Sequence, residues 1–318
     1  MKLPHPLYWA GSSLEFTFTG PELRLAFDAD FEQLEPWISA ELNGAPLLRM
    51  PLERGNSSVC LFRGMTPGVP KHVRIFKETQ PITDDPLHRL EAVEVTGTVG
   101  ELLPVPPRPL FLEFIGDSLT SGEGLAGARE ETDWISPFFS ASRSWARRTA
   151  DLLQADFRAV SQSGWGVCSG WDGDAAHAIP PWYEETRSLR GREPDVIIIN
   201  LGTNDASAIQ SGLGPVGPDG FEKGVLAFLR QLRAEHPAAR LVWAYGMLDD
   251  PLRPQLERAV KRIGDAWYLP LPAVTAETMG SRQHPGPLCH KAAAETTAEF
   301  LKTILQGPPP SAARPIKY

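Results

Sequence analysis

A run of prolines divides the chain into two parts with different hydrophobic patterns. The run is Leu103-Pro104-Val105-Pro106-Pro107-Arg108-Pro109. Such a segment is stiff and extended, which is typical of a linker. We therefore predict a domain boundary here, with one domain over residues 1–105 and a second over residues 106–318. The length of 318 residues is sufficient for two hydrophobic cores.

Before the prolines, apolar and polar residues alternate in short segments, as in strands with one buried face. Gly20-Pro21 separates the first two segments and predicts that they form a hairpin, and Asn43-Gly44 predicts a second hairpin. Several short strands in succession predict a β-sandwich or a small barrel. The expected strands are Leu14–Thr19, Leu23–Phe27, Trp37–Leu42, Pro46–Leu48, Lys71–Lys77 and Leu90–Val99.

After the prolines, almost continuously apolar strands alternate with amphipathic helices. This order predicts a parallel sheet with helices on both faces, in which a functional site lies at the carboxyl ends of the strands. The expected strands are Leu110–Ile115, Phe157–Val160, Asp195–Leu201, Leu241–Tyr245 and Ala266–Leu269, and the expected helices are Ser144–Gln154, Phe221–Glu235, Gln255–Ile263 and Ala292–Leu305.

Three short motifs follow strand ends in this second domain, and a histidine precedes the last helix. The motifs are Gly116-Asp117-Ser118-Leu119-Thr120, Ser163-Gly164-Trp165-Gly166 and Gly202-Thr203-Asn204-Asp205, and the histidine is His284. A serine needs a base to accept its proton, and histidine titrates near neutral pH. The backbone amides of Ser118 and Gly164 and the side-chain amide of Asn204 are candidate donors for an oxyanion. The set predicts acyl transfer.

These four blocks resemble the SGNH (GDSL-like) hydrolase family, whose named residues match Ser118, Gly164, Asn204 and His284. The β-rich first domain makes the chain similar, more narrowly, to the two-domain acetyl esterases of carbohydrate esterase family 2. The resemblance implies a three-layer α/β/α, flavodoxin-like hydrolase domain with a parallel sheet, preceded by an all-β, jelly-roll-like sandwich. It also implies a serine carboxylic-ester hydrolase related to acetylxylan esterases.

One position departs from the wider family pattern. Most SGNH enzymes carry an Asp three residues before the His, where this chain has Ser281, and the nearest upstream carboxylate is Glu277. The resemblance to family 2 implies a Ser–His dyad in which a main-chain carbonyl orients the imidazole. We therefore predict a dyad of Ser118 and His284.

Residues near the motifs are candidates for contact with the substrate. They are Asp117, Trp165, Trp171 and Trp182. A tryptophan face can stack on a sugar ring, although ordinary packing is the alternative for each. Gly122-Glu123-Gly124-Leu125-Ala126-Gly127 fits a dinucleotide fingerprint, but no apolar helix follows it, and we interpret it as a flexible loop beside the nucleophile.

Some single residues have alternative interpretations. Ser118 alone is compatible with a turn, and His290 is a second late histidine that we expect to cap or pack the final helix. Cys289 and His290 lack a further ligand cluster, so we expect no metal.

The predicted function is a carbohydrate O-acetyl esterase that needs no cofactor and acts on acetylated mono- or oligosaccharides. The alternatives are a general short-chain acyl esterase or lipase-like SGNH hydrolase, and a sugar-binding protein with weak or no turnover. A net charge of -8 argues against nucleic acid or an anionic membrane as partner. Three widely spaced cysteines and an N-terminus without an apolar signal core predict a cytoplasmic protein, or a secreted one if a leader is missing. The oligomeric state stays open.

Overall fold

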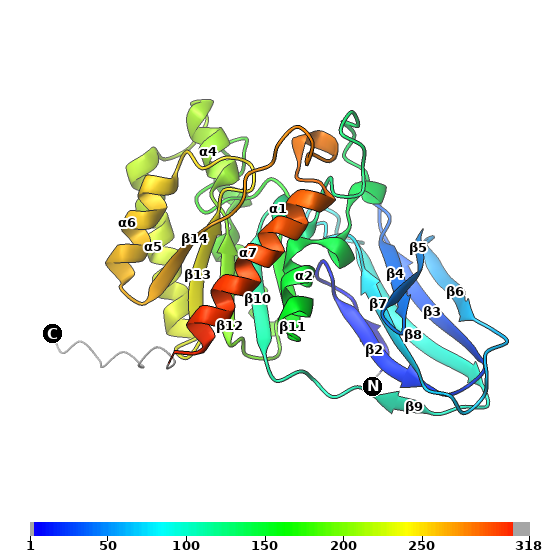
Figure 1. The fold of residues 1–318 in the computed structure, drawn as a ribbon. Helices are drawn as coiled ribbons and strands as arrows, with labels where there is room; N and C mark the ends of the chain where they lie inside the picture. The colour runs from blue at the N-terminus through cyan, green and yellow to red at the C-terminus, as the bar shows by residue number, and fades with distance from the viewer. Residues whose placement is uncertain (1–2, 308–318) are drawn as a thin grey trace. The chain divides into compact units, whose positions relative to one another are not determined.

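The computed structural model describes residues 3–307, which form two compact units (Figure 1). The first unit runs to Pro107 and also includes Asp133–Ser142, and the second contains Arg108–Thr132 and the chain from Arg143. The predicted boundary after residue 105 lies two residues before this division, and the return of Asp133–Ser142 to the first unit was not predicted. Residues 308–318, the end of the predicted second domain, lie outside the described residues.

The first unit is a sandwich of two antiparallel sheets. One sheet has the order β1-β8-β3-β6 and the other the order β5-β4-β7-β2-β9. In chain order the strands are β1 His5–Pro6, β2 Ser13–Phe18, β3 Glu22–Asp30, β4 Trp37–Leu42, β5 Ala45–Pro51, β6 Gly55–Phe62, β7 Lys71–Lys77, β8 Arg89–Thr98 and β9 Leu102–Pro104.

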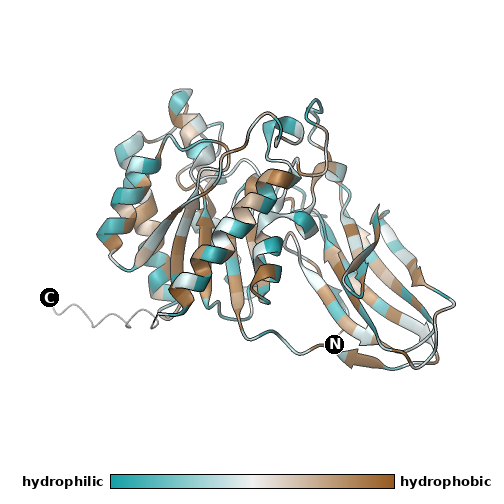
Figure 2. Ribbon diagram, in the orientation of Figure 1, coloured by the Kyte–Doolittle hydropathy of each residue, from teal (hydrophilic) through white to brown (hydrophobic). Residues whose placement is uncertain are grey.

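Alternate residues of β2 and β3 are buried, as the sequence pattern predicts. The hydropathy colouring shows the same alternation along the strands of the sandwich (Figure 2). The buried faces meet in one cluster that includes Phe16, Leu25 and Phe27. Because each strand contributes one apolar face, both sheets are stabilised by the same core.

Two expectations for this unit are wrong, and one is confirmed. β2 and β3 do not form a hairpin, because they lie in different sheets and the turn at Gly20-Pro21 carries the chain across the sandwich. Leu102–Pro104 is not linker but the edge strand β9, which pairs with β2. An edge strand tolerates proline because one side of its backbone has no partner strand. The hairpin at Asn43-Gly44 is confirmed by the antiparallel pairing of β4 and β5.

The second unit is built on a parallel sheet of five strands in the order β11-β10-β12-β13-β14. The strands are β10 Phe111–Gly116, β11 Asp156–Ser161, β12 Val196–Asn200, β13 Arg240–Tyr245 and β14 Ala266–Pro270. This is the flavodoxin-like order, in which connections diverge between β10 and β12 and open a crevice at their carboxyl ends. The predicted parallel α/β domain is therefore confirmed.

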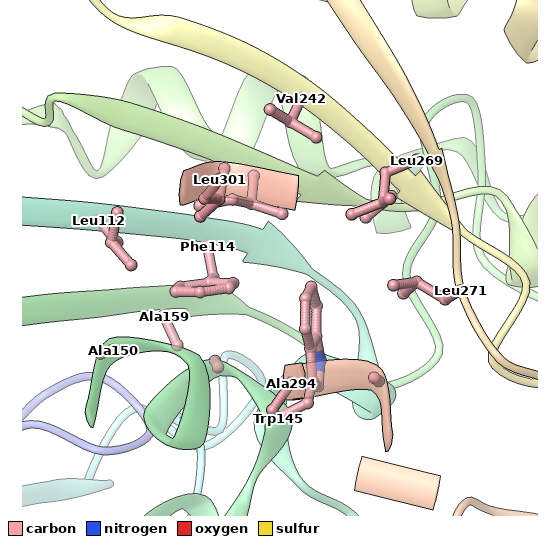
Figure 3. Packing of buried hydrophobic residues seen from close by; sticks show 14 of the residues in the cluster. Leu112, Phe114, Trp145, Ala150, Ala159, Val242, Leu269, Leu271, Ala294 and Leu301 are labelled. Atoms are coloured by element: carbon pink, nitrogen blue, oxygen red, sulfur yellow. The ribbon is translucent and has the colours of Figure 1, made fainter. Parts of the chain in front are cut away.

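Helices cover both faces of this sheet (Figure 1). On one face α2 and α7 pack together, and Trp145 of α2 meets Phe114 of β10 edge to face at 5.1 Å (Figure 3). On the other face, Tyr183 of α3 contacts Phe228 of α5 and donates a hydrogen bond to Glu113 of β10. The helices are α1 Ser118–Ser121, α2 Trp145–Leu152, α3 Ile179–Glu185, α4 Thr203–Gln210, α5 Pro218–Glu235, α6 Arg253–Ile263 and α7 Pro287–Leu305.

The final helix α7 begins at Pro287, five residues before the predicted start at Ala292. Proline at the first helical position fits there because that position has no intrahelical partner for an N–H group. Within residues 3–307, no helix is long and apolar enough to cross a membrane.

Candidate active site

Ser118 is the first residue of the short helix α1, directly after β10. The Asp117 side chain caps this helix by accepting a 3.0 Å hydrogen bond from the Leu119 amide. Gly122 ends the helix in a left-handed conformation. The strand, the cap and the glycine thus present Ser118 at the carboxyl edge of the sheet, where its side chain is 7% exposed.

His284 lies against Ser118, although 166 residues separate them in the chain. The Nε2 atom of His284 is 2.8 Å from the Oγ atom of Ser118. The His284 Nδ1 atom is 2.8 Å from the main-chain oxygen of Arg282. Because a carbonyl oxygen only accepts hydrogen bonds, Nδ1 carries the proton of the neutral imidazole. Nε2 is then free to accept the hydroxyl proton of Ser118.

The loop that supplies this carbonyl has an unusual backbone. Arg282 and Gln283 have φ values of 54° and 59°, so two successive non-glycine residues are left-handed. Such residues are uncommon outside sites where the surrounding structure fixes them. The two left-handed residues turn the Arg282 carbonyl toward the imidazole of His284, two positions later.

Within the described residues 3–307, no carboxylate bonds to Nδ1 of His284. Ser281, at the position of the usual Asp, is buried and donates its backbone N–H to the Gly124 carbonyl. Glu277 is exposed and accepts a hydrogen bond from the Thr275 hydroxyl. The geometry therefore has the form of the predicted dyad, with a main-chain carbonyl in the orienting position.

Gly164 lies in a tight turn with a φ of 80°. The buried carboxylate of Asp205 fixes the residues that follow, because it accepts hydrogen bonds of 2.8 Å and 2.7 Å from the Val167 and Cys168 amides. Burial raises the pKa of Asp205 to about 6, against the opposing effect of these amides. A Cβ at Gly166 would lie 2.4 Å from this carboxylate, so only glycine fits there.

Asn204 begins α4 together with Thr203, at the carboxyl end of β12. Its Nδ2 atom is 2.8 Å from the Trp165 carbonyl oxygen and 3.3 Å from Oδ2 of Asp117. An amide nitrogen carries two hydrogens, and the longer contact is the weaker of the two. The hydrogen nearest Asp117 is therefore the one that can turn to a developing oxyanion.

The proposed contact of Asp117 with substrate does not agree with the structure. Asp117 is 0% exposed, and its two oxygens face the Leu119 amide and the Asn204 side chain. Burial raises the pKa of this carboxyl to about 7. Asp117 thus holds α1 and the Asn204 amide in place from inside the protein.

The three tryptophans differ in exposure. Trp171 is 58% exposed, donates its backbone N–H to the Gly164 carbonyl and lies 3.0 Å from the Cβ position of Gly164. Trp165 is partly buried. Trp182 is 7% exposed and packs edge to face on Trp165 at 5.6 Å. Trp171 and Trp165 can thus meet a ligand, whereas the burial of Trp182 argues against the predicted direct contact.

The segment after α1 is not the flexible loop that the glycines predict. Residues 122–125 are buried, and Glu123 donates its backbone N–H to the Ser118 carbonyl at 3.0 Å. The carbonyl of Gly124 accepts the N–H of Ser281. Only from Ala126 does the loop become exposed. Gly124 serves close packing against the histidine loop, because a Cβ there would lie 2.6 Å from the Cβ of His284.

His290 lies inside α7 and is 0% exposed. Its Nδ1 atom accepts a 3.0 Å hydrogen bond from the backbone N–H of Trp145, the first residue of α2. Burial lowers the pKa of His290 to about 3, which keeps the ring neutral. His290 therefore packs α7 against the start of α2, as expected, and His284 is the histidine that contacts Ser118. Among residues 3–307, no three His, Cys, Asp or Glu side chains gather as a metal site.

The model of the GDSL-like Lipase/Acylhydrolase family matches residues 114–279, which include the Ser118, Gly164 and Asn204 motifs. The chain belongs to this family. The match begins in β10 and ends five residues before His284. It covers the core of the second unit, and the sandwich lies outside it.

Solved structures are similar over both units. An acetyl xylan esterase, Est2A, from the rumen bacterium Butyrivibrio proteoclasticus has a TM-score of 0.88 and 34% identity, over 95% of this chain and 92% of that one. A family two carbohydrate esterase from Clostridium thermocellum, in complex with cellohexaose, has a TM-score of 0.85 and 24% identity, over 95% of each chain. The family member described here thus has the two-domain fold of carbohydrate esterase family 2.

Among curated proteins, cellulase/esterase CelE of Acetivibrio thermocellus is 26% identical over 93% of this chain. A further relative is the acetylxylan esterase / glucomannan deacetylase of Cellvibrio japonicus, which is 32% identical over 33% of this chain. The matches span 37% and 32% of the lengths of these two relatives.

Sequence reasoning did not single out two residues of this site. Asp205 stands out in the sequence only as a member of the Asn204 motif, and Glu123 only as a member of a glycine-rich segment. Asp205 orders the turn after Gly164, and Glu123 is a buried carboxylate 3.8 Å from His284 Nε2. The signal for Asp205 in the sequence is its position one residue after Asn204. In the structure this position lies in the first turn of α4, from which the carboxylate reaches the amides of Val167 and Cys168.

Proposed function

We propose that this family member is a carbohydrate O-acetyl esterase that works through Ser118 and His284. The observation that carries the proposal is the continuous chain of contacts from Ser118 Oγ to His284 Nε2 and from His284 Nδ1 to the Arg282 carbonyl, each 2.8 Å long. This chain fixes the imidazole tautomer that a base needs.

In the first step Ser118 Oγ forms a bond to the acetyl carbonyl carbon while its proton moves to His284 Nε2. The carbonyl oxygen gains negative charge, for which the Ser118 and Gly164 amides and Asn204 Nδ2 are the candidate donors. The tetrahedral intermediate collapses when the bond to the sugar oxygen breaks. That oxygen takes the proton from His284, which leaves an acetyl-Ser118 ester and a free sugar hydroxyl.

In the second step a water molecule attacks the acetyl-enzyme. His284 accepts a proton from the water and returns it to Ser118 Oγ as acetate leaves. All proton transfers use one imidazole, and no redox change or electron carrier is required. The Arg282 carbonyl stabilises the imidazolium less than a carboxylate would, but it holds the same ring orientation.

The sugar specificity is supported by the surroundings of Ser118. Trp171 exposes more than half of its side chain beside the turn of Gly164. An exposed indole face beside a candidate oxyanion donor offers a platform for the apolar face of a sugar ring. The 34% identical relative is named an acetyl xylan esterase, which makes acetylated polysaccharide fragments the first substrates to test.

The test is an acetate-release screen over acetylated mono- and oligosaccharides, with Ser118→Ala as the control. We expect release from at least one acetylated sugar by the native chain and none by the variant. A fluorophosphonate probe should label the native protein only. Turnover of small acyl esters without any acetylated sugar would favour a general short-chain esterase. Absence of labelling of the folded protein would favour a sugar-binding protein without turnover.

A further inference from the structure

Glu123 is a buried carboxylate next to the dyad that the mechanism above does not use. Its side chain is 3% exposed, and its Oε1 atom lies 3.8 Å from His284 Nε2. The same oxygen is 3.0 Å from Nε of Arg282, and the backbone N–H of Glu123 bonds to the Ser118 carbonyl. One residue is thus tied to the nucleophile, to the base and to the residue whose carbonyl orients the base.

The Glu123 carboxylate lies near the ring nitrogen of His284 that becomes protonated during the reaction. When Ser118 attacks, Nε2 of His284 takes the proton and the ring becomes cationic. A carboxylate within about 4 Å of a cation in a partly buried site favours the charged form. The Arg282 carbonyl on the opposite ring nitrogen offers only a partial charge, whereas Glu123 offers a full negative charge.

The ion pair with Arg282 gives the carboxylate a second effect. The Arg282 side chain is 35% exposed, and its backbone N–H donates a 2.8 Å hydrogen bond to the Glu131 carbonyl. Arg282 is thereby held both at its backbone and at its guanidinium while its φ stays at 54°. Holding this residue also holds the carbonyl that bonds to His284 Nδ1.

We propose that Glu123 is a positioning residue that takes over, from the Nε2 side of His284, the electrostatic role of the Asp absent at position 281. It stabilises the imidazolium and, through Arg282, fixes the carbonyl that orients the ring. The inference rests on the proposed esterase function, since it assigns a role within the same reaction.

The first test is Glu123→Gln, which keeps the shape of the side chain and removes its charge. We expect kcat for p-nitrophenyl acetate to fall by about tenfold to a hundredfold, with KM close to the native value. The acidic limb of the kcat/KM profile should move to lower pH by about one unit, because the imidazolium loses its anionic neighbour. Glu277→Gln, which neutralises an exposed carboxylate seven residues before His284, is the matched control and should change neither.

The second test is Arg282→Gln, which removes the cation and leaves both the main-chain carbonyl and Glu123. The acidic limb should then move to higher pH, opposite to the shift in Glu123→Gln. Around His284, Glu123 lies 3.8 Å from Nε2, Arg282 pairs with Glu123, and His290 on α7, which interacts electrostatically with His284, is neutral. Because the two substitutions change opposite charges, a purely structural role of the ion pair predicts shifts of the same sign or none.

The outcomes separate this inference from the proposed function. Suppose that the native chain turns over ester and Ser118→Ala does not. If Glu123→Gln then has the native kcat and pH profile, the inference about Glu123 is wrong and the proposed esterase function is retained. If the native chain neither turns over ester nor reacts with fluorophosphonate, both are wrong. Circular dichroism checks that each variant folds. If Glu123→Gln does not fold, Arg282→Gln provides the test. An acidic limb that stays at the native pH or moves to lower pH in Arg282→Gln overturns the inference.

Discussion

Gly124 packs directly against His284: a Cβ atom at Gly124 would lie 2.6 Å from the Cβ atom of His284 and 2.5 Å from the Ser281 carbonyl oxygen. Gly124 also has a φ of 74°. The histidine loop therefore approaches the segment after the nucleophile as closely as a bare backbone allows. The distance between Ser118 and His284 depends on this contact, because Gly124 links the two segments.

We expect Gly124→Ala to impair catalysis more than its effect on stability explains. The methyl group must push His284 or the Ser281 backbone away, and a displacement near 1 Å can reduce kcat about a hundredfold. Gly191→Ala is the matched control, since Gly191 also has a positive φ of 56° but nothing within 4 Å of its Cβ position. Both variants should lose about 1 kcal/mol for the left-handed backbone, and only Gly124→Ala should lose turnover. Equal turnover in the two variants would contradict the packing argument.

Replacing His284 should abolish the reaction, whereas the buried second histidine matters for stability. His284→Asn is expected to lower kcat for an aryl acetate by about 10⁴-fold or more. His290→Asn should instead lower the melting temperature, because the α2 amide of Trp145 loses a well-placed acceptor. Steady-state kinetics and thermal denaturation of both variants check this. A folded His284→Asn protein with near-native kcat would remove the imidazole from the mechanism.

Trp171→Ala should weaken binding of sugar esters without affecting small esters. The exposed indole lies beside Gly164, so its loss removes a stacking surface and leaves the dyad intact. We expect KM for an acetylated oligosaccharide to rise about fivefold or more, with kcat/KM for p-nitrophenyl acetate unchanged. Leu152→Ala, at a 49% exposed leucine at the end of α2, is the control for loss of surface area. Unchanged KM for every sugar ester would exclude Trp171 as a platform.

The raised pKa of Asp117 predicts how stability depends on pH. Burial raises this pKa from 3.8 to about 7, so the folded state binds the proton more tightly than the unfolded state. The stabilisation by the neutral carboxyl is complete below about pH 4 and is lost as the pH rises to about 7, by at most about 1.4 kcal/mol per pH unit. Asp117→Asn cannot titrate, yet Asn still caps helices well.

The free energy of unfolding of Asp117→Asn, measured with urea from pH 4.5 to 7.5, should therefore rise relative to the native value as the pH increases. Asp205, whose pKa burial raises to about 6, titrates in both proteins. Its negative charge also raises the pKa of Asp117, so repulsion between the two carboxylates adds to the loss of stability of the native protein as the pH rises. A difference that stays constant or shrinks with rising pH would show that Asp117 is ionised in the folded protein across this range.

Much of the second unit could be predicted because its strands are buried on both faces. Val196–Asn200 and Arg240–Tyr245 are buried at every residue, which appears in the sequence as short apolar runs. Phe111–Gly116 and Val196–Asn200 each end at a motif, and parallel strands bring their carboxyl ends to one edge. For this reason Ser118 and Asn204 could be placed together without a structure.

The sandwich was less predictable, because alternation shows that a strand has one buried face but not which strand is its neighbour. β2 and β3 both alternate, and the pairing partners β7 and β6 lie far along the chain. The roles of Asp117 and Glu123 were also hidden. Carboxylates in loops are ordinarily exposed, and only three-dimensional packing shows that these two are buried.

The order of the dyad along the chain has a consequence for the biosynthesis of the protein. Ser118 lies in the first strand-to-helix turn of the second unit, whereas His284 lies three residues before the last described helix, α7, which packs on α2 through His290 and Trp145. A nascent chain that has not yet placed α7 holds a serine without its base. Under the proposed mechanism, ester hydrolysis therefore requires α7 to have docked, and turnover would report that step.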